Sequence, residues 1–225
     1  FGIPMAGYTY FFTFEETELH RRQSYWKCVC SMGIDLSQGD DFTAFTFLFP
    51  LGNGAYGVKT RSYVSELKIQ KLPPAMRLKY EEFLAEGTLV VMEGAILDMM
   101  RVYDDLNDHI IQNQYTVVAF GYDPYNAKDF VDKWASEYGE YGLEKVRQGA
   151  ITESVPLGEL RLLAEERLLL HDEELMKFAM GNAVVIEDNN GNMKLSKRRS
   201  SEKIDNVSAL MDAWVVYKRN QEAFG

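Results

Sequence analysis

Three aspartates stand at positions from which they could hold divalent metal ions. Asp35 ends an apolar run that begins at Cys28, and Asp123 directly follows the apolar run 115–122. If these runs form neighbouring parallel strands, their carboxyl ends bring both acids to the edge where open α/β sheets bind ligands. Asp205 lies in the first turns of the last predicted helix, and a helix that returns across this edge adds it to the cluster.

Three clustered carboxylates repel one another unless a cation neutralises them. Ligands that offer only oxygen atoms suit Mg²⁺ or Mn²⁺. Two such ions about 4 Å apart can activate water and stabilise the leaving oxygen in phosphodiester hydrolysis. Each acid also has a simpler interpretation. Asp35 and Asp123 are typical turn residues, and Asp205 would be stabilised by the positive end of the helix dipole.

Two further acids and a basic strip surround this predicted centre. Asp41 directly precedes the second strand and is either an additional acid of the site or a turn residue. Asp212 lies two helical turns after Asp205 on the same face, where it either reaches the site or lines its rim. The basic residues beside Asp205 are Lys194, Lys197, Arg198, Arg199 and Lys203. A basic strip beside an acid cluster fits a polyanion held over metal ions, whereas alone it is typical of a solvated loop.

The overall composition limits the possible functions. The chain has 225 residues, 46% of them hydrophobic, which is enough for one sizeable core. Its formal net charge of −10 argues against a constitutive nucleic-acid binder, because Lys and Arg supply the affinity for phosphate. It does not exclude an enzyme with acids around metal ions and a local basic strip. No apolar run reaches the length of a membrane span.

The periodicity of apolar residues predicts an α/β domain with a mixed sheet flanked by helices. Three antiparallel strands come first, and strands that alternate with helices follow. The predicted strands are Cys28–Leu36, Phe42–Leu51, Val58–Val64, Leu89–Met92, Tyr115–Tyr122 and Glu144–Arg147, with an extra hairpin of Ala183–Glu187 and Met193–Ser196. The predicted helices are Pro74–Glu86, Ile96–Ile111, Ala127–Tyr138, Leu157–Leu170, Glu173–Met180 and a last helix from about Ser201.

A glycine-rich segment from Gly52 to Gly57 matches the pattern Gly-x-Gly-x-x-Gly. A phosphate-binding loop of this kind must open a helix, so that the amides of the helix N-terminus face the phosphates. Here Val58–Val64 alternates like a strand, and Asn53-Gly54 is a typical hairpin turn. The segment is therefore predicted to be a β-hairpin.

Five motifs together resemble the nuclease domain of the terminase large subunits of tailed phages. In chain order they are Gly33-Ile34-Asp35-Leu36-Ser37 with Asp41, Phe120-Gly121-Tyr122-Asp123-Pro124-Tyr125-Asn126-Ala127, Val146-Arg147-Gln148-Gly149, the Gly191-Asn192 turn with Lys197, and Lys203-Ile204-Asp205-Asn206-Val207-Ser208-Ala209-Leu210. The resemblance covers residues 28–220, and the order and spacing of the motifs are more specific than any one of them.

The resemblance implies a ribonuclease H-like fold with a two-metal site. It implies that Asp35, Asp123 and Asp205 bind Mg²⁺ or Mn²⁺, with Asp41 as an additional acid. With this activity, we predict that the basic strip binds DNA. The implied activity is the cutting of concatemeric double-stranded phage DNA in the host-cell cytoplasm. Many relatives carry His-Asp or paired acids where this chain has Ile204-Asp205, which keeps Asp212 as an alternative third ligand.

The same resemblance implies partners and a domain division. The implied partners are double-stranded DNA, the portal protein, the terminase small subunit and an upstream ATPase domain of the full-length chain. Residues 1–27 are then the connection from that ATPase domain, and residues 28–225 the nuclease domain. Two rival functions remain: another enzyme of this fold, a junction resolvase or exonuclease, and a domain that mainly docks the portal or small subunit.

Overall fold

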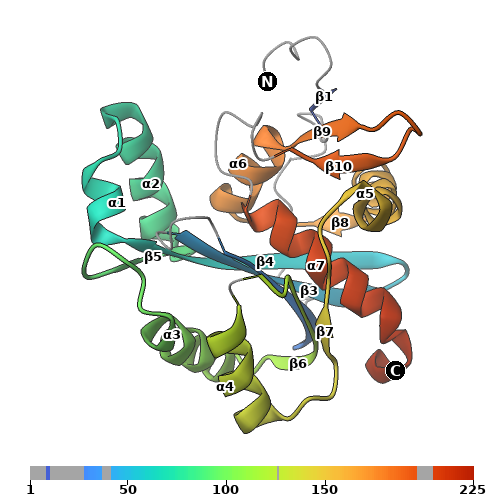
Figure 1. Cartoon of the computed structure of the whole chain (residues 1–225), viewed down its shortest axis with the longest axis horizontal. Helices are drawn as coiled ribbons and strands as arrows, with labels where there is room; N and C mark the ends of the chain where they lie inside the picture. The colour runs from blue at the N-terminus through green and yellow to red at the C-terminus, as the bar shows by residue number, and fades with distance from the viewer. Residues whose placement is uncertain (1–8, 11–27, 37–41, 126, 197–204) are drawn as a thin grey trace.

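A mixed seven-stranded sheet forms the centre of the molecule, with helices on both faces (Figure 1). The computed structural model describes residues 9–10, 28–36, 42–125, 127–196 and 205–225. In spatial order the strands are β5 (Leu89–Met92), β4 (Ala55–Ser65), β3 (Phe42–Gly52), β2 (Val29–Leu36), β6 (Thr116–Tyr122) and β7 (Leu143–Lys145), and β8 (Leu169–Leu170) pairs with β4.

Five strands of this sheet run in the same direction, so their carboxyl ends lie at one edge. β3 is antiparallel to β2 and β4, whereas the pairs β4–β5, β2–β6 and β6–β7 are parallel. The prediction of three antiparallel strands followed by parallel strands is confirmed. We call the edge where β2, β4, β5, β6 and β7 end the carboxyl edge.

The glycine-rich segment forms the turn of the β3–β4 hairpin. Asn53 and Gly54 have φ angles of 55° and 75°, the left-handed conformation that two-residue hairpin turns require. The next residues continue as β4 and open no helix. The predicted hairpin is confirmed, and the alternative of a phosphate-binding loop is wrong.

Helices cover the two faces of the sheet with separate apolar cores. The helices are α1 (Glu66–Gln70), α2 (Pro74–Glu86), α3 (Met99–Gln112), α4 (Lys128–Tyr138), α5 (Ala150–Glu165), α6 (Glu174–Asn182) and α7 (Asp205–Arg219). Helices α3 and α4 pack on one face, against residues such as Phe45 and Phe120. Helices α5, α6 and α7 pack on the other, against Leu48 and Val58. Among the described residues, none of the helices has the length and apolar character that a membrane crossing requires.

The extra hairpin near the carboxyl end of the chain is confirmed. Strands β9 (Val184–Glu187) and β10 (Met193–Leu195) pair in antiparallel fashion, and β1 (Thr9–Tyr10) pairs with the other side of β9. This small sheet packs beside α5, because the N–H groups of Met193 and Leu195 donate to side chains of that helix.

The predicted helix Leu157–Leu170 is wrong at both ends. Helix α5 begins at Ala150 and passes through Pro156, which lacks the N–H for a bond to the preceding turn. The buried Glu153 carboxylate holds this first part in place, because it accepts hydrogen bonds from the N–H groups of Gly149 and Leu195. Leu169–Leu170 instead forms β8, since its backbone pairs with β4.

Candidate metal centre

Asp35 and Asp123 occupy corresponding positions at the ends of two neighbouring parallel strands. In the register of β2 and β6, Ile34 pairs with Tyr122, the last residue of β6, so Asp35 and Asp123 each follow directly after this pair. Neighbouring strands lie about 4.8 Å apart. The prediction that the two apolar runs are parallel neighbours is confirmed, and it brings the backbones of both acids together at the carboxyl edge.

The two acids differ in their surroundings. Asp35 is 5% exposed, whereas Asp123 is half-buried. The Asp123 Oδ1 atom accepts a hydrogen bond of 3.0 Å from the N–H of Tyr125, so the interpretation of Asp123 as a turn residue is confirmed. This turn also fixes the Asp123 carboxylate at the end of β6.

Helix α7 crosses β2 and β6 in direct contact with two glycines (Figure 1). A Cβ atom at Gly33 would lie 1.9 Å from the carbonyl oxygen of Ala209, and one at Gly121 would lie 2.7 Å from that of Asp212. Only glycine lets the helix backbone approach this closely. A glycine within an apolar strand was therefore a sequence signal that another backbone packs closely on the strand. It does not tell which helix does so.

The face of β2 that contacts α7 also carries Asp35. The Ser31 hydroxyl donates a hydrogen bond of 2.7 Å to the carbonyl oxygen of Ala213, and Gly33 contacts the same helix. Because alternate residues of a strand point to the same face, the Asp35 side chain is on the α7 side of the sheet.

Helix α7 carries both candidates for the third ligand. Asp205 is its first residue and Asp212 lies seven residues later, about 10 Å along the axis. Both are 5% exposed. The backbone of Asp212 rests on Gly121, two residues inside the sheet from Asp123. Asp205 therefore lies nearer to the carboxyl edge than Asp212.

A buried asparagine that the sequence analysis missed anchors the start of α7. The Asn206 amide donates hydrogen bonds to the hydroxyls of Thr60 and Ser62, the second at 2.8 Å. The Thr46 hydroxyl donates to the Asn206 carbonyl oxygen at 2.9 Å. The available signal was a polar residue directly after Asp205, at the start of a helix with an apolar face.

The register of the sheet relates this anchor to Asp35. Ser62 pairs with Ala44, and Ala44 pairs with Asp35, so the three residues form one row across the sheet. Since the Asn206 amide bonds to Ser62, the neighbouring Asp205 is held beside this row. Asn206 thus fixes the backbone from which Asp205 projects.

Replacing Asn206 with alanine is expected to weaken Mn²⁺ binding about 10- to 100-fold, as for residues that orient metal ligands. It should also lower the free energy of unfolding by about 1–3 kcal/mol, because buried hydroxyls lose their partner. Calorimetric titration with Mn²⁺ and urea unfolding measure the two effects. Asn113→Ala, which removes an exposed amide from the end of α3, is the control. Loss of stability with unchanged Mn²⁺ affinity would limit Asn206 to a structural role.

A buried acid lies behind this anchor. The N–H of Thr60 donates a hydrogen bond of 2.8 Å to Glu173, which is 9% exposed. Burial raises the pKa of Glu173 well above its ordinary value, although Lys59 and the Thr60 N–H act in the opposite direction. Lys59 itself forms a 2.6 Å ion pair with Asp172. Glu173 therefore supports β4 through its hydrogen bond with the Thr60 N–H.

The remaining predicted site residues divide into one described residue and five that lie outside the described part of the chain. Lys194 is exposed on β10, in the hairpin that packs on α5. Those outside are Asp41, Lys197, Arg198, Arg199 and Lys203. In the sequence, the basic strip joins β10 directly to α7.

The donor types at the carboxyl edge fit a hard divalent cation. Asp35, Asp123 and Asp205 offer only carboxylate oxygens, which Mg²⁺ and Mn²⁺ prefer. With the side chains as they stand, no three His, Cys, Asp or Glu residues within the described ranges are grouped closely enough to hold a metal ion. The structure thus aligns the backbones of Asp35 and Asp123 but does not group the three acid side chains.

Comparisons with known proteins agree with this architecture. A family model described as "Terminase large subunit, endonuclease domain" matches residues 18–221. The terminase large subunit of Lactococcus phage SK1 is 24% identical over 215 residues, which cover 93% of this chain and 39% of the relative. The chain thus spans about two fifths of the length of this relative.

Two solved structures have a similar fold. The large terminase of bacteriophage HK97 has a TM-score of 0.79 and 21% identity, over 92% of this chain and 43% of that one. The nuclease domain of the large terminase of bacteriophage SPP1, solved with bound Mn, has a TM-score of 0.52 and 12% identity, over 90% and 92% of the two chains. The predicted α/β fold with a mixed sheet and a late hairpin is confirmed.

Proposed function

The chain belongs to the family of terminase large subunit endonuclease domains, and we propose that it cuts concatemeric double-stranded DNA with the help of Mg²⁺ or Mn²⁺. The observation that carries this proposal is the register of β2 and β6, which aligns Asp35 with Asp123 at the carboxyl edge. The Mn bound in the SPP1 nuclease domain supports a divalent metal as the cofactor.

Three acids would hold two metal ions in this proposal. Asp35 and Asp123 present carboxylates from neighbouring strands, and Asp205 adds a third from the start of α7. Bound ions at this position would activate water and stabilise the leaving oxygen of the phosphodiester. Asp41 is a possible additional acid, and Asp212 is the alternative third ligand. The close packing of α7 on Gly33 and Gly121 supports a fixed relation between the helix and the strands.

Charge and sequence context support a role for the basic strip in holding DNA. Lys194, Lys197, Arg198, Arg199 and Lys203 lead directly into Asp205, so phosphates bound there would lie near the acids. Recognition would mainly involve the DNA backbone, because the sequence contains no base-reading motif.

The wider setting is part of the proposal. An upstream ATPase domain of the full-length chain, the portal protein and the terminase small subunit are the proposed partners in the host-cell cytoplasm. Residues 1–27 would connect to the ATPase domain, and residues 28–225 would form the nuclease domain. The chain covers 39% of the terminase large subunit of Lactococcus phage SK1, which supports a larger full-length protein.

Removal of divalent metal is expected to abolish nicking of supercoiled plasmid by this protein. With Mn²⁺ or Mg²⁺, nicked and linear forms should accumulate, whereas with EDTA the plasmid should remain supercoiled. Gel electrophoresis measures the three forms, and a branched substrate beside a linear one separates a resolvase from a terminase nuclease. A folded protein that binds Mn²⁺ but cuts no DNA would contradict the proposal and favour a docking role.

A further inference from the structure

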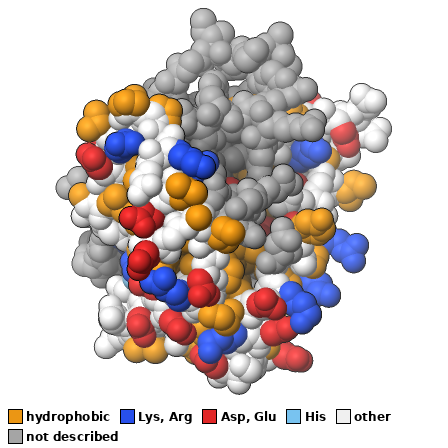
Figure 2. Space-filling view, turned by 60° about the vertical axis from the view of Figure 1, so that its left-hand side comes forward, with side chains coloured by type: hydrophobic (Ala, Val, Ile, Leu, Met, Phe, Trp, Pro, Cys, Tyr) orange, Lys and Arg blue, Asp and Glu red, His pale blue; other side chains and the backbone are white. Residues whose placement is uncertain are grey.

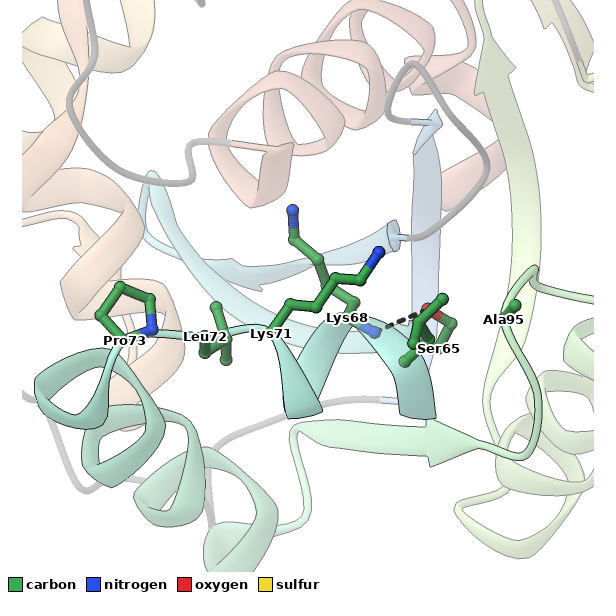
Figure 3. Close-up of a pocket in the computed structure, with 7 residues that line it drawn as sticks. Ser65, Lys68, Lys71, Leu72, Pro73 and Ala95 are labelled. Atoms are coloured by element: carbon green, nitrogen blue, oxygen red, sulfur yellow. Dashed lines mark hydrogen bonds between the residues drawn. The ribbon is translucent and has the colours of Figure 1, made fainter.

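A pocket beside α1 lies at the same edge of the sheet as Asp35 and Asp123. Helix α1 begins directly after Ser65, the last residue of β4, and β4 is parallel to β2 and β6. The pocket has a volume of about 410 Å³. Its lining residues are Ser65, Leu67, Lys68, Lys71, Leu72, Pro73 and Ala95 (Figure 3).

The charge of this pocket is opposite to that of the chain as a whole. Lys68 and Lys71 are its charged lining residues, and the lining contains no acid. Figure 3 shows their side chains extending from α1 in the same direction, toward the side of the view where α7 lies. Figure 2, which brings the side of α1 and α2 forward, shows that acidic and basic side chains are mixed over the wider face. A polyanion that approaches this acidic protein would therefore find local attraction at α1.

Hydrogen bonds hold the backbone of α1 in a defined position. The N–H of Lys68 donates to the Ser65 hydroxyl at 3.2 Å, which caps the helix. The N–H of Leu67 donates to the carbonyl oxygen of Gly94 at 3.2 Å, which ties α1 to the segment after β5. The two lysines thus project from a support that is attached to two parallel strands.

The register of β2, β3 and β4 gives the distance between the backbones of Asp35 and Ser65, the residue before α1. Asp35 lies in one row with Ser62 of β4, two strands away, which is about 10 Å across the sheet. Ser65 lies three residues further along β4, another 10 Å or so. The backbones are therefore roughly 14 Å apart, the length of about four nucleotides at 3.4 Å each.

We propose that Lys68 and Lys71 bind backbone phosphates of the DNA a few nucleotides from the phosphate that is cut. This inference rests on the proposed nuclease function. It adds a second phosphate contact to the basic strip 194–203, on a different element of the fold. The two lysines hold the duplex in place and do not take part in the chemical step.

The test compares Lys68→Ala/Lys71→Ala with a control that removes the same charge elsewhere. Lys79→Ala/Lys133→Ala is that control, because its lysines lie on α2 and α4 in exposed ion pairs with Glu82 and Glu137. Fluorescence anisotropy measures binding of a labelled duplex in Ca²⁺ between about 50 and 200 mM salt, the range over which affinity from phosphate contacts falls steeply. Circular dichroism and thermal melting establish that both variants are folded.

Loss of both contacts should reduce the slope of log K against log[salt] by about 1.8, which is about 0.9 for each phosphate. In plasmid nicking the Lys68→Ala/Lys71→Ala variant should have a higher KM with an unchanged kcat, as for an interaction equal in ground and transition states. The inference is overturned if this variant has the slope and affinity of the control while the wild type binds DNA. A wild type that binds no duplex would overturn the proposed function, and this inference with it.

Discussion

Asp35→Asn is expected to lower the rate of metal-dependent DNA cutting by about 10³-fold or more, which is about 4 kcal/mol of transition-state stabilisation. The side chain keeps its size but loses the charge that would bind the cation. Nicking of supercoiled plasmid in Mn²⁺ measures the rate. The same substitution should also remove the rise in melting temperature that Mn²⁺ gives the wild type, because a ligand stabilises only the state that binds it.

Substitutions of the other acids show which of them act with Asp35. Asp123→Asn and Asp205→Asn should behave like Asp35→Asn, whereas Asp132→Asn, an exposed acid paired with Lys128, should leave cutting unchanged. Cutting that survives in Asp205→Asn and stops in Asp212→Asn would show that Asp212 is the third ligand. Full activity in Asp35→Asn would contradict the proposed metal centre.

Gly33→Ala is expected to lower the free energy of unfolding by roughly 3 kcal/mol or more, the upper range for overpacking a core. The added Cβ would lie 1.9 Å from the carbonyl oxygen of Ala209, so α7 must move away from the sheet. Activity should fall further than the loss of folded protein explains, because a shift of about 1 Å at Asp205 can cost 10²-fold. Urea unfolding and nicking at a temperature where the variant is folded measure the two effects.

Gly158→Ala is the matched control for this substitution. Gly158 lies in α5, and no atom is within 4 Å of the Cβ position. Alanine should therefore stabilise the protein by about 0.5–1 kcal/mol through helix propensity alone. If Gly33→Ala is as stable and as active as the wild type, α7 does not rest on β2 as described.

Local patterns in the sequence were sufficient for most elements of the sheet. The apolar runs before Asp35 and Asp123 indicated buried strands, since continuous apolar residues suit strands that are covered on both faces. Asn53-Gly54 indicated its hairpin, because this turn needs residues that tolerate positive φ. The predicted helix Leu157–Leu170 began too late, because tertiary contacts of Glu153 keep α5 helical before and through Pro156.

By itself, the sequence determined the fold class, the family and the three acids to test, because each depends on residue types and their order along the chain. Tertiary structure alone decided which groups meet. The pairing of Ile34 with Tyr122 aligned Asp35 with Asp123. The hydrogen bond from the Asn206 amide to Ser62 of β4 fixed the backbone next to Asp205. It also brought Lys68 and Lys71 to the same edge. The pairing of Ile34 with Tyr122 and the bond between Asn206 and Ser62 join residues more than 30 positions apart, which no local pattern of hydrophobicity or turn residues encodes.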